Sequence, residues 1–399
     1  MSDLETNRCR ICGGTECGVL MDFGPRPITK RLLPTPDASG EFTHHIKLDI
    51  CHTCGFVQIL DTVPERELYS EYALQSTWKP QPHFLDEIAK LKEFAALAPA
   101  DFIMEIGCND GSALLSLREQ GMVKVLGVEP SSDVAAIAKS RGFDVINDFF
   151  NTERAEAVVS GHGLCDLLIC RQVLEHVAYL DDFMLAIRAV LKEGGHLMLE
   201  VPDFNVPLQY GDVSAIWEEH VNYFTEESLR FLLLKHGFTP VHTCRYDFSG
   251  GALTIIARKG YRPTTPPTPP REFASNTMFA QRAAQSAAVV AAFLQQQGYS
   301  PREVAIYGAG NRAVILLNRF LGDLVGLVVD DQPEKQGRFL PQSGKRVHPS
   351  DSLVKSGIKV CLLAVNAENE EAVIRRNKTF LDQGGSFFSV LSPSRYLIR

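Results

Sequence analysis

The sequence has no long apolar run and no surplus of basic residues. None of its apolar segments reaches the roughly eighteen residues that a helix needs to cross a bilayer, so we expect no membrane-spanning helix. Asp and Glu outnumber Lys and Arg by 48 to 40, for a net charge of −8, which argues against a nucleic-acid-binding surface. The first residues, Met1 to Glu5, also lack a basic stretch followed by an apolar core. We therefore expect a cytoplasmic protein with no membrane or nucleic-acid partner.

Cysteine is too scarce for a disulfide scaffold, with ten in 399 residues. Four of them nevertheless form two Cys-x-x-Cys pairs, Cys9 with Cys12 and Cys51 with Cys54. Two such pairs can supply the four thiolates of a tetrahedral zinc site, whereas the alternatives are a chance pairing or a redox pair. Four thiolates leave no open position for a substrate. The predicted zinc is therefore structural, and the nearby Cys17 is not needed as a ligand.

A strand, a glycine turn and a helix are predicted for residues 102–120. An apolar run ends at Glu105, the loop after it contains Gly107 and Gly111, and a helical pattern follows. Glycine lets the backbone approach a ligand closely, and a helix N-terminus offers free N–H groups beside it. The next predicted strand ends at Glu129, where an acid can bind ribose hydroxyls. This spacing is typical of a nucleoside-binding unit, although tight strand–helix turns also need glycine for packing alone.

Strands and helices continue to alternate after this unit. The alternation predicts a parallel, doubly wound α/β sheet with ligands at the carboxyl ends of its strands. We expect strands at 144–146, 166–170 and 196–201, and a helix from 181 to 192 that ends at a cap formed by the glycines 194 and 195. Asp148 and Phe149 follow one strand end, where they could bind and stack on adenine, unless Phe149 is simply part of the core.

The stretch with the most varied chemistry is 216–224, Ile-Trp-Glu-Glu-His-Val-Asn-Tyr-Phe. A histidine hydrogen-bonded to a carboxylate suits a general base at neutral pH. An ordinary surface helix start is the alternative, and Thr225 does fit a helix cap, but that interpretation explains the cluster from Trp217 to Tyr223 poorly. We therefore predict a functional His220 with Glu219 as its partner.

The composition changes at residues 260–271, where five prolines predict an extended linker. A long helix is expected at 273–297, followed by a second strand, glycine turn and helix that begin at residue 303. Such a turn can bind phosphates through its N–H groups. An exposed basic loop further on could add cations for a diphosphate or could simply be solvated. The side chains concerned are Asn311, Arg312, Lys335 and Arg338.

With the cysteine pairs, the two glycine turns and the Glu219-His220 stretch in this order, the whole chain resembles the S-adenosylmethionine-dependent sugar C-methyltransferases. These enzymes make C-methyl branched deoxysugars from nucleotide-linked 4-keto sugars. The resemblance implies a small zinc-binding domain at 1–75, a central class I methyltransferase Rossmann-like domain at 76–260, a Pro-rich linker at 261–272, and a second Rossmann-like domain at 273–399 that helps to hold the sugar nucleotide. The expected partner is thus a small-molecule nucleotide sugar. The sequence does not give the oligomeric state, and a monomer is compatible with it.

The resemblance also implies roles for individual residues. Glu129 would bind the ribose of S-adenosylmethionine, and Asp148 and Phe149 its adenine. Tyr72 would be an aromatic contributor from the N-terminal segment, and His176 a second active-site histidine. The remaining residues expected to line the cofactor site are Glu105, Gly107, Cys108, Asn109, Asp110, Gly111 and Gln172.

The resemblance has departures, and other functions are open. Trp217 stands where the family usually has a tyrosine, and residues 249–254 lack the usual histidine and arginine.

We expect His220 to remove a proton next to the ketone while His176 or Tyr223 stabilises the enolate oxygen. The alternatives are O- or N-methylation of a sugar or other metabolite, and a non-catalytic, zinc-containing binding protein.

Overall fold

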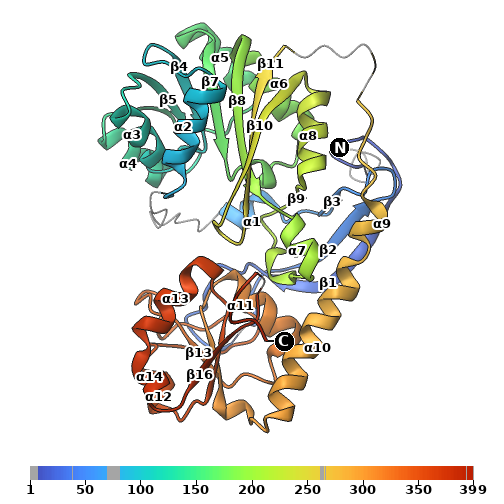
Figure 1. Ribbon diagram of the computed structural model, residues 1–399, viewed down its shortest axis with the longest axis vertical. Helices are drawn as coiled ribbons and strands as arrows, with labels where there is room; N and C mark the ends of the chain where they lie inside the picture. The colour runs from blue at the N-terminus through green and yellow to red at the C-terminus, as the bar shows by residue number, and fades with distance from the viewer. Residues whose placement is uncertain are drawn as a thin grey trace.

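The computed structural model describes residues 8–37, 39–69, 81–260, 265, 267–391 and 393–398. The predicted contributor Tyr72 lies outside these residues. Three sheets form an elongated molecule in which a large α/β half lies above a smaller one (Figure 1). Among the helices in these ranges, none combines the length and apolar character that a membrane span requires.

The upper half is built on a seven-stranded sheet. Five neighbouring strands are parallel, and the hairpin β10–β11 adds an antiparallel edge on one side. The strand order is β10 (Phe238–Tyr246), β11 (Ala252–Lys259), β8 (Leu191–Pro202), β7 (Cys165–Arg171), β4 (Phe102–Ile106), β5 (Lys124–Val128) and β6 (Asp144–Ile146).

Helices cover both faces of this sheet, so the predicted doubly wound α/β fold is confirmed. One face packs on α2 (Phe84–Phe94), α3 (Ser112–Glu119) and α4 (Ser132–Ser140). The opposite face packs on α5 (Thr152–His162), α6 (Leu180–Val190) and α8 (Glu226–Lys235). Successive residues of a strand point to opposite faces, which is why Ile103 and Met104 belong to different apolar cores. Shorter segments at the strand ends are η1 (Leu174–His176), α7 (Asn205–Tyr210) and η2 (Val213–Ala215).

The predicted glycine cap after α6 is wrong. The helix already ends at Val190, and β8 begins at the next residue and runs through both glycines. The register against β7 shifts here, because Cys165 pairs with Leu191 whereas Leu167 pairs with His196. Gly194, with φ +77°, therefore serves an irregularity within the strand rather than the end of a helix.

A four-stranded sheet joins the N-terminal segment to the upper half. Its order is β1 (Cys17–Pro27), β2 (Thr43–Cys51), β3 (Val57–Gln58) and β9 (Asn222–Tyr223). Strand β9 belongs by sequence to the central region and begins two residues after His220. The N-terminal sheet thus reaches beyond the predicted boundary at residue 75 and fixes the backbone next to the predicted base. The short helix α1 (Glu65–Tyr69) follows β3.

The lower half is a second parallel α/β unit. Its five strands are ordered β14 (Val347–His348), β13 (Leu327–Val329), β12 (Val304–Tyr307), β15 (Val360–Leu363) and β16 (Ser386–Ser389). The helical segments are η3 (Pro301–Glu303), α11 (Asn311–Leu316), η4 (Leu317–Leu321), α12 (Ser352–Lys355), α13 (Ala367–Arg376) and α14 (Lys378–Asp382). The single helix expected at 273–297 is instead α9 (Phe273–Asn276) and α10 (Phe279–Gln296), which run along one side of the molecule toward the lower half (Figure 1).

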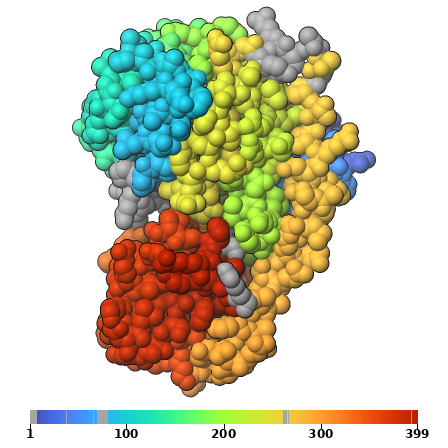
Figure 2. Space-filling model, viewed as in Figure 1, coloured from blue at the N-terminus to red at the C-terminus, as the bar shows by residue number. Residues whose placement is uncertain are grey.

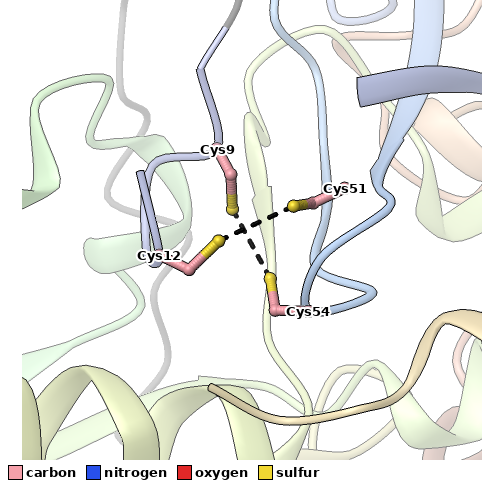
Figure 3. Close-up of side chains that lie close together, drawn as sticks. All are labelled: Cys9, Cys12, Cys51 and Cys54. Atoms are coloured by element: carbon pink, nitrogen blue, oxygen red, sulfur yellow. Dashed lines mark hydrogen bonds between the residues drawn. The ribbon is translucent and has the colours of Figure 1, made fainter. Parts of the chain in front are cut away.

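The four cysteines of the two Cys-x-x-Cys pairs converge, as Figure 3 shows. Their ligand atoms all lie within 4.8 Å of one another, and the Sγ–Sγ distance is 3.6 Å for both Cys9–Cys54 and Cys12–Cys51. Sulfurs at about 2.3 Å from a tetrahedral zinc ion lie roughly 3.8 Å apart, so the four thiols fit this metal. Each is a free cysteine. The four predicted cysteines therefore form a cluster whose geometry fits a structural zinc ion.

The first cysteine pair also contacts the upper half through the residue inside it. Arg10 donates three hydrogen bonds from its guanidinium, to the carbonyl oxygens of Ile59 at 2.7 Å, Val221 at 3.0 Å and Ala178 at 3.1 Å. The last two acceptors lie next to the segments that carry His220 and His176. The zinc site thereby fixes the backbone of both predicted active-site histidines.

A second arginine joins the two α/β halves. Arg312 donates to Asn366 Oδ1 at 2.9 Å within the lower half. Toward the upper half it donates to Ser214 Oγ at 2.9 Å, to the Ser249 carbonyl oxygen at 3.0 Å and to Asp212 Oδ2 at 3.3 Å. The expected contact of this residue with a substrate phosphate stays a prediction, since the structure shows its donors engaged between the halves.

Replacing one zinc ligand should remove the metal and destabilise the protein. We expect the Cys51→Ser variant to lose its zinc and to unfold at a lower temperature, because three thiolates hold the ion far less tightly than four and the zinc-bound fold carries part of the folding free energy. Metal content by atomic emission and thermal unfolding by circular dichroism test this. Cys17→Ser is the matched control and should keep one zinc per chain. Equal zinc content in Cys51→Ser would exclude the four-cysteine site.

Removing the arginine between the halves should loosen their contact. The Arg312→Ala variant loses four hydrogen bonds and leaves the buried Asp212 without its ion pair, so we expect a loss of roughly 2 to 3 kcal/mol in the free energy of unfolding. Urea denaturation measures it, and small-angle scattering reports whether the halves separate. The exposed Arg302→Ala change is the control and should leave stability within experimental error. An unchanged midpoint in Arg312→Ala would show that the contact contributes no stability.

Candidate active site in the cleft between the halves

A large cleft of about 3040 Å³ lies between the two α/β halves. Its walls come from the glycine turn after β4, the segments around both histidines, the N-terminal residues 28–32 and the turn after β12. Figure 2 shows one face of the boundary, where the green and yellow upper half meets the red lower half. Parts of the chain that are far apart in sequence therefore share one site.

The turn after β4 has the shape that its glycines allow. Gly107 has φ +74°, and a Cβ atom there would lie 2.5 Å from Val173 Cγ2. Glu105 lines the cleft in a buried position, and its Oε2 has no hydrogen-bond partner among the described residues. Burial raises the pKa of this carboxyl to about 7. A buried, unsatisfied carboxylate oxygen fits a cationic ligand group such as the ammonium of S-adenosylmethionine.

Glu129 holds the turn from the neighbouring strand. Its Oε2 accepts from the Asn109 N–H at 3.0 Å and its Oε1 from the Ser131 N–H at 2.8 Å. Burial raises the pKa of Glu129, and these two hydrogen bonds oppose the shift. Glu129 and Asn109 both line the cleft. The Glu129 carboxylate is already held in position by these hydrogen bonds, so it could also accept a hydrogen bond from a ligand hydroxyl.

Three further residues expected at the cofactor site are held in place by contacts of their own. A Cβ atom on Gly127 would lie only 2.5 Å from Cys108 Sγ, so the thiol packs closely against this glycine. Burial raises the pKa of the Cys108 thiol. Asp110 forms an ion pair with Arg141 at 3.0 Å. Gln172, at φ +53°, donates to Glu200 Oε1 at 3.0 Å. All three predicted residues line the cleft.

Asp148 and Phe149 lie at the far end of this wall. Phe149 is 52% exposed and lines the cleft, so the interpretation of it as a core residue is wrong. The Asp148 carboxylate forms an ion pair with Arg154. An exposed ring beside a fixed carboxylate is a surface on which a planar base can stack.

The two predicted active-site histidines, His176 and His220, contact each other in the cleft. The rings of His176 and His220 have centroids 4.8 Å apart and are nearly perpendicular, at 82°. His176 Nδ1 lies 2.9 Å from the carbonyl oxygen of Glu219, which can only accept, so Nδ1 carries the hydrogen. His176 Nε2 is then an acceptor, and it lies 3.9 Å from Glu175 Oε1.

The surroundings keep both histidines neutral. Burial lowers the pKa of His220 well below its usual value, and the charges of Lys30 and Arg312 add to the shift. Burial also lowers the pKa of His176. The buried Glu175 carboxyl has its pKa raised to about 8 for the same reason. A neutral imidazole at physiological pH can accept a proton, which is what a general base requires.

The expected pairing of Glu219 with His220 is wrong. Glu219 Oε2 accepts from Lys30 Nζ at 2.8 Å, and its Oε1 has no partner among the described residues. His220 instead packs on the Trp217 ring at a centroid distance of 4.2 Å. Lys30 also lies over that ring, 5.0 Å from its centroid. Sequence analysis missed Lys30, because nothing in the segment between the cysteine pairs marks it as close to residue 219.

Tyr223 is not part of the cleft. It lies in β9, is 4% exposed and packs on Phe204, and its hydroxyl points toward the Trp217 carbonyl oxygen at 3.5 Å. The structure therefore does not place this phenol where a substrate oxygen could reach it. The sequence also did not reveal the contact made by Glu218, the residue before Glu219. Its carboxylate accepts hydrogen bonds from the N–H and the hydroxyl of Thr29 at 2.7 and 2.9 Å.

The lower wall of the cleft repeats the arrangement of the upper one. Asp330, at the end of β13, accepts from the Ala309 N–H at 2.7 Å and the Gln332 N–H at 2.9 Å, as Glu129 does in the first unit. The side-chain amide of Asn311 lies 3.0 Å from the Thr29 hydroxyl oxygen, whose single hydrogen is donated to Glu218. Lys335 forms an ion pair with Asp330 at 3.2 Å, and Arg338 is exposed. The four predicted substrate-binding residues all line the same cleft.

Comparison with solved structures gives similarities confined to part of the chain. A 1,6-didemethyltoxoflavin-N1-methyltransferase from Burkholderia thailandensis is 20% identical over 46% of this chain and 81% of its own, with a TM-score of 0.36. The magnesium protoporphyrin IX methyltransferase of Synechocystis is 16% identical over 49% of this chain and 92% of its own, with a TM-score of 0.35.

Sequence comparisons cover the chain more fully. Three family models match in succession: "Putative zinc binding domain" at residues 9–69, "Methyltransferase domain" at 79–243 and "C-methyltransferase C-terminal domain" at 271–392. The C-methyltransferase NovU of Streptomyces niveus is 26% identical over 98% of this chain and 97% of its own length. The chain therefore belongs to the S-adenosylmethionine-dependent methyltransferases that combine a zinc-binding domain, a methyltransferase domain and a C-methyltransferase C-terminal domain.

Proposed function

We propose that the protein transfers a methyl group from S-adenosylmethionine to a carbon next to the ketone of a nucleotide-linked keto-deoxysugar. The observation that carries this proposal is the pair of neutral histidines in the cleft. The same cleft is lined by the glycine turn after β4, where the cofactor is expected, and by the glycine turn after β12, where a phosphate could bind. Carbon becomes nucleophilic only after deprotonation, so C-methylation needs a base at this place. The similarity to a C-methyltransferase over nearly the whole chain agrees with it.

The cofactor would lie along the upper wall. Glu105 would accept from its α-ammonium group, Glu129 from its ribose hydroxyls, and Phe149 would stack on adenine beside Asp148. S-adenosylmethionine, when bound, supplies a methyl group made electrophilic by a positively charged sulfur. The contribution of the glycine turn is to let the backbone come close and to fix the direction in which the methyl group points.

His220 would act as the base. It is neutral, lines the cleft and makes no side-chain hydrogen bond to another described residue that would occupy its lone pair. The ring of His176 lies beside it, with 4.8 Å between the ring centroids, and can orient the His220 ring. Removal of the proton next to the ketone then gives a carbanion whose charge spreads onto oxygen.

The nucleotide part of the substrate would lie along the lower wall. Asn311, Lys335 and Arg338, with the N–H groups of the turn after β12, suit the oxygens of a diphosphate. Arg312 would add its charge from its fixed position between the halves. The sugar would then extend from this wall toward His220.

Neutralising Glu105 should weaken cofactor binding and remove its pH dependence. Because the pKa of this carboxyl is about 7 in the free protein, wild-type affinity for S-adenosylhomocysteine should rise between pH 6 and pH 8 as the carboxylate ionises. Glu105→Gln should bind roughly 10- to 100-fold more weakly at pH 8, the loss of one charge-assisted hydrogen bond, with a flat pH profile. Calorimetry measures both. The exposed Glu156→Gln serves as control, and an unaltered profile in Glu105→Gln would contradict the assignment.

Removing the base should stop carbon chemistry without affecting the cofactor. His220→Ala should bind S-adenosylhomocysteine like the wild type but lose turnover by about 10²- to 10⁴-fold, together with exchange of the sugar C3 proton in deuterated water. Proton NMR follows the exchange and also shows whether the product methyl group is on carbon, oxygen or nitrogen. His162→Ala, on the outer end of α5, is the control. Wild-type exchange in His220→Ala would exclude this base, and a methyl group on oxygen or nitrogen would overturn carbon methylation.

A further inference from the structure

Neither donor predicted for the developing enolate oxygen is available in the structure. Tyr223 is buried outside the cleft and its hydroxyl faces the Trp217 carbonyl oxygen. His176 faces the cleft, but its Nδ1 hydrogen is donated to the Glu219 carbonyl oxygen. Its Nε2 is therefore an acceptor in the neutral ring and cannot donate to an enolate. Without a donor, the negative charge that develops on that oxygen would lack a hydrogen bond from the protein.

Lys30 lies where such a donor is required. It follows β1 in the N-terminal segment and lines the cleft together with His176 and His220. Its Nζ lies 2.8 Å from Glu219 Oε2 and 5.0 Å from the centroid of the Trp217 ring, the ring on which His220 packs. Its side chain is 40% exposed, so it can meet a ligand from the cleft. Glu219 and Trp217, from the central region of the chain, thus hold the ammonium of Lys30, from the N-terminal segment, beside the proposed base.

The other cation near His220 cannot take the same part. The Arg312 guanidinium donates to four acceptors on both halves and is fixed by them. Lys30 is held by the neighbour of His220 itself, and an ammonium carries three N–H groups. A substrate oxygen could therefore be bound by Lys30 while Glu219 keeps the ammonium in position.

We propose that Lys30 is a catalytic residue that binds the carbonyl oxygen of the sugar and stabilises the enolate, with Glu219 as its positioning residue. This inference rests on the proposed carbon methylation. His220 takes the proton, the C–H electron pair forms the C=C bond, and the carbonyl π pair moves to the oxygen bound by Lys30. The enolate carbon then attacks the methyl group, the S–CH₃ bond breaks to leave a neutral thioether, the C=O bond re-forms, and His220 returns its proton to water.

The test compares Lys30→Met and Lys30→Arg with wild type. The probes are dTDP- and UDP-linked 4-keto-6-deoxyglucose and their 2-deoxy forms. In Lys30→Met we expect kcat and C3-proton exchange, measured with S-adenosylhomocysteine present, to fall together by about 10²- to 10³-fold, with smaller changes in KM. Lys30→Arg should recover part of both. Lys47→Met, an exposed lysine of β2, is the matched control and should behave like wild type.

A double variant separates catalysis from simple charge pairing. Lys30→Met leaves the buried Glu219 carboxylate without its cation, which could slow the enzyme by misplacing residues 219 and 220. In Lys30→Met/Glu219→Gln that unpaired charge is gone. Slow exchange in the double variant, with zinc content and S-adenosylhomocysteine affinity retained, supports Lys30 as the donor. Wild-type exchange in either variant would overturn it and leave carbon methylation intact, whereas a wild-type protein that exchanges no probe would overturn both proposals.

Discussion

Arg10 is the residue on which the arrangement of the active site most depends. It lies between two zinc-ligand cysteines, so its backbone is fixed by the metal site, and its guanidinium binds carbonyl oxygens next to both histidines. Burial lowers its pKa to about 10, which still leaves it charged at neutral pH. Buried carbonyl groups need donors, and here one cation satisfies three of them. The segment that carries the cysteines therefore helps to position the backbone beside both histidines of the cleft.

The N-terminal segment also explains how two α/β units form one cleft. Its cysteines and Phe56 belong to the apolar core of the upper half, whereas Phe23, Ile28 and Leu48 belong to a core shared with the lower half. Residue 33 pairs with Phe339 of the lower half through two backbone hydrogen bonds. The N-terminal segment therefore contacts both halves and fixes their relative position, so the cleft does not depend on the connection between the two α/β units alone.

Local patterns in the sequence predicted the parts of this fold that depend on neighbouring residues. The Cys-x-x-Cys pairs, the glycine turn at 107–111 and the alternation of strands and helices are of this kind. They correctly predicted the fold class, the convergence of the four cysteines and the tight turn after β4. The errors concern contacts between distant segments. Glu219 looked like the partner of His220 because they are adjacent, yet Lys30 reaches it from 189 residues away in the chain. Tyr223 looked accessible because of its polar neighbours, but β9 joins the N-terminal sheet and turns it into the core. No sequence periodicity contains that information.

The contacts of the Thr29 hydroxyl with Glu218 and with Asn311 have a consequence for the order in which the site forms. They connect positions 29, 218 and 311, so the site closes only when the last α/β unit has been synthesised and has packed. Contacts of such long range form slowly, because each requires closure of a large loop of chain. A chain that ends before residue 300 contains the four cysteines and the first glycine turn, but it lacks the strands that form the lower wall. The complete cleft is therefore formed last, when the C-terminal α/β unit packs against the rest of the chain.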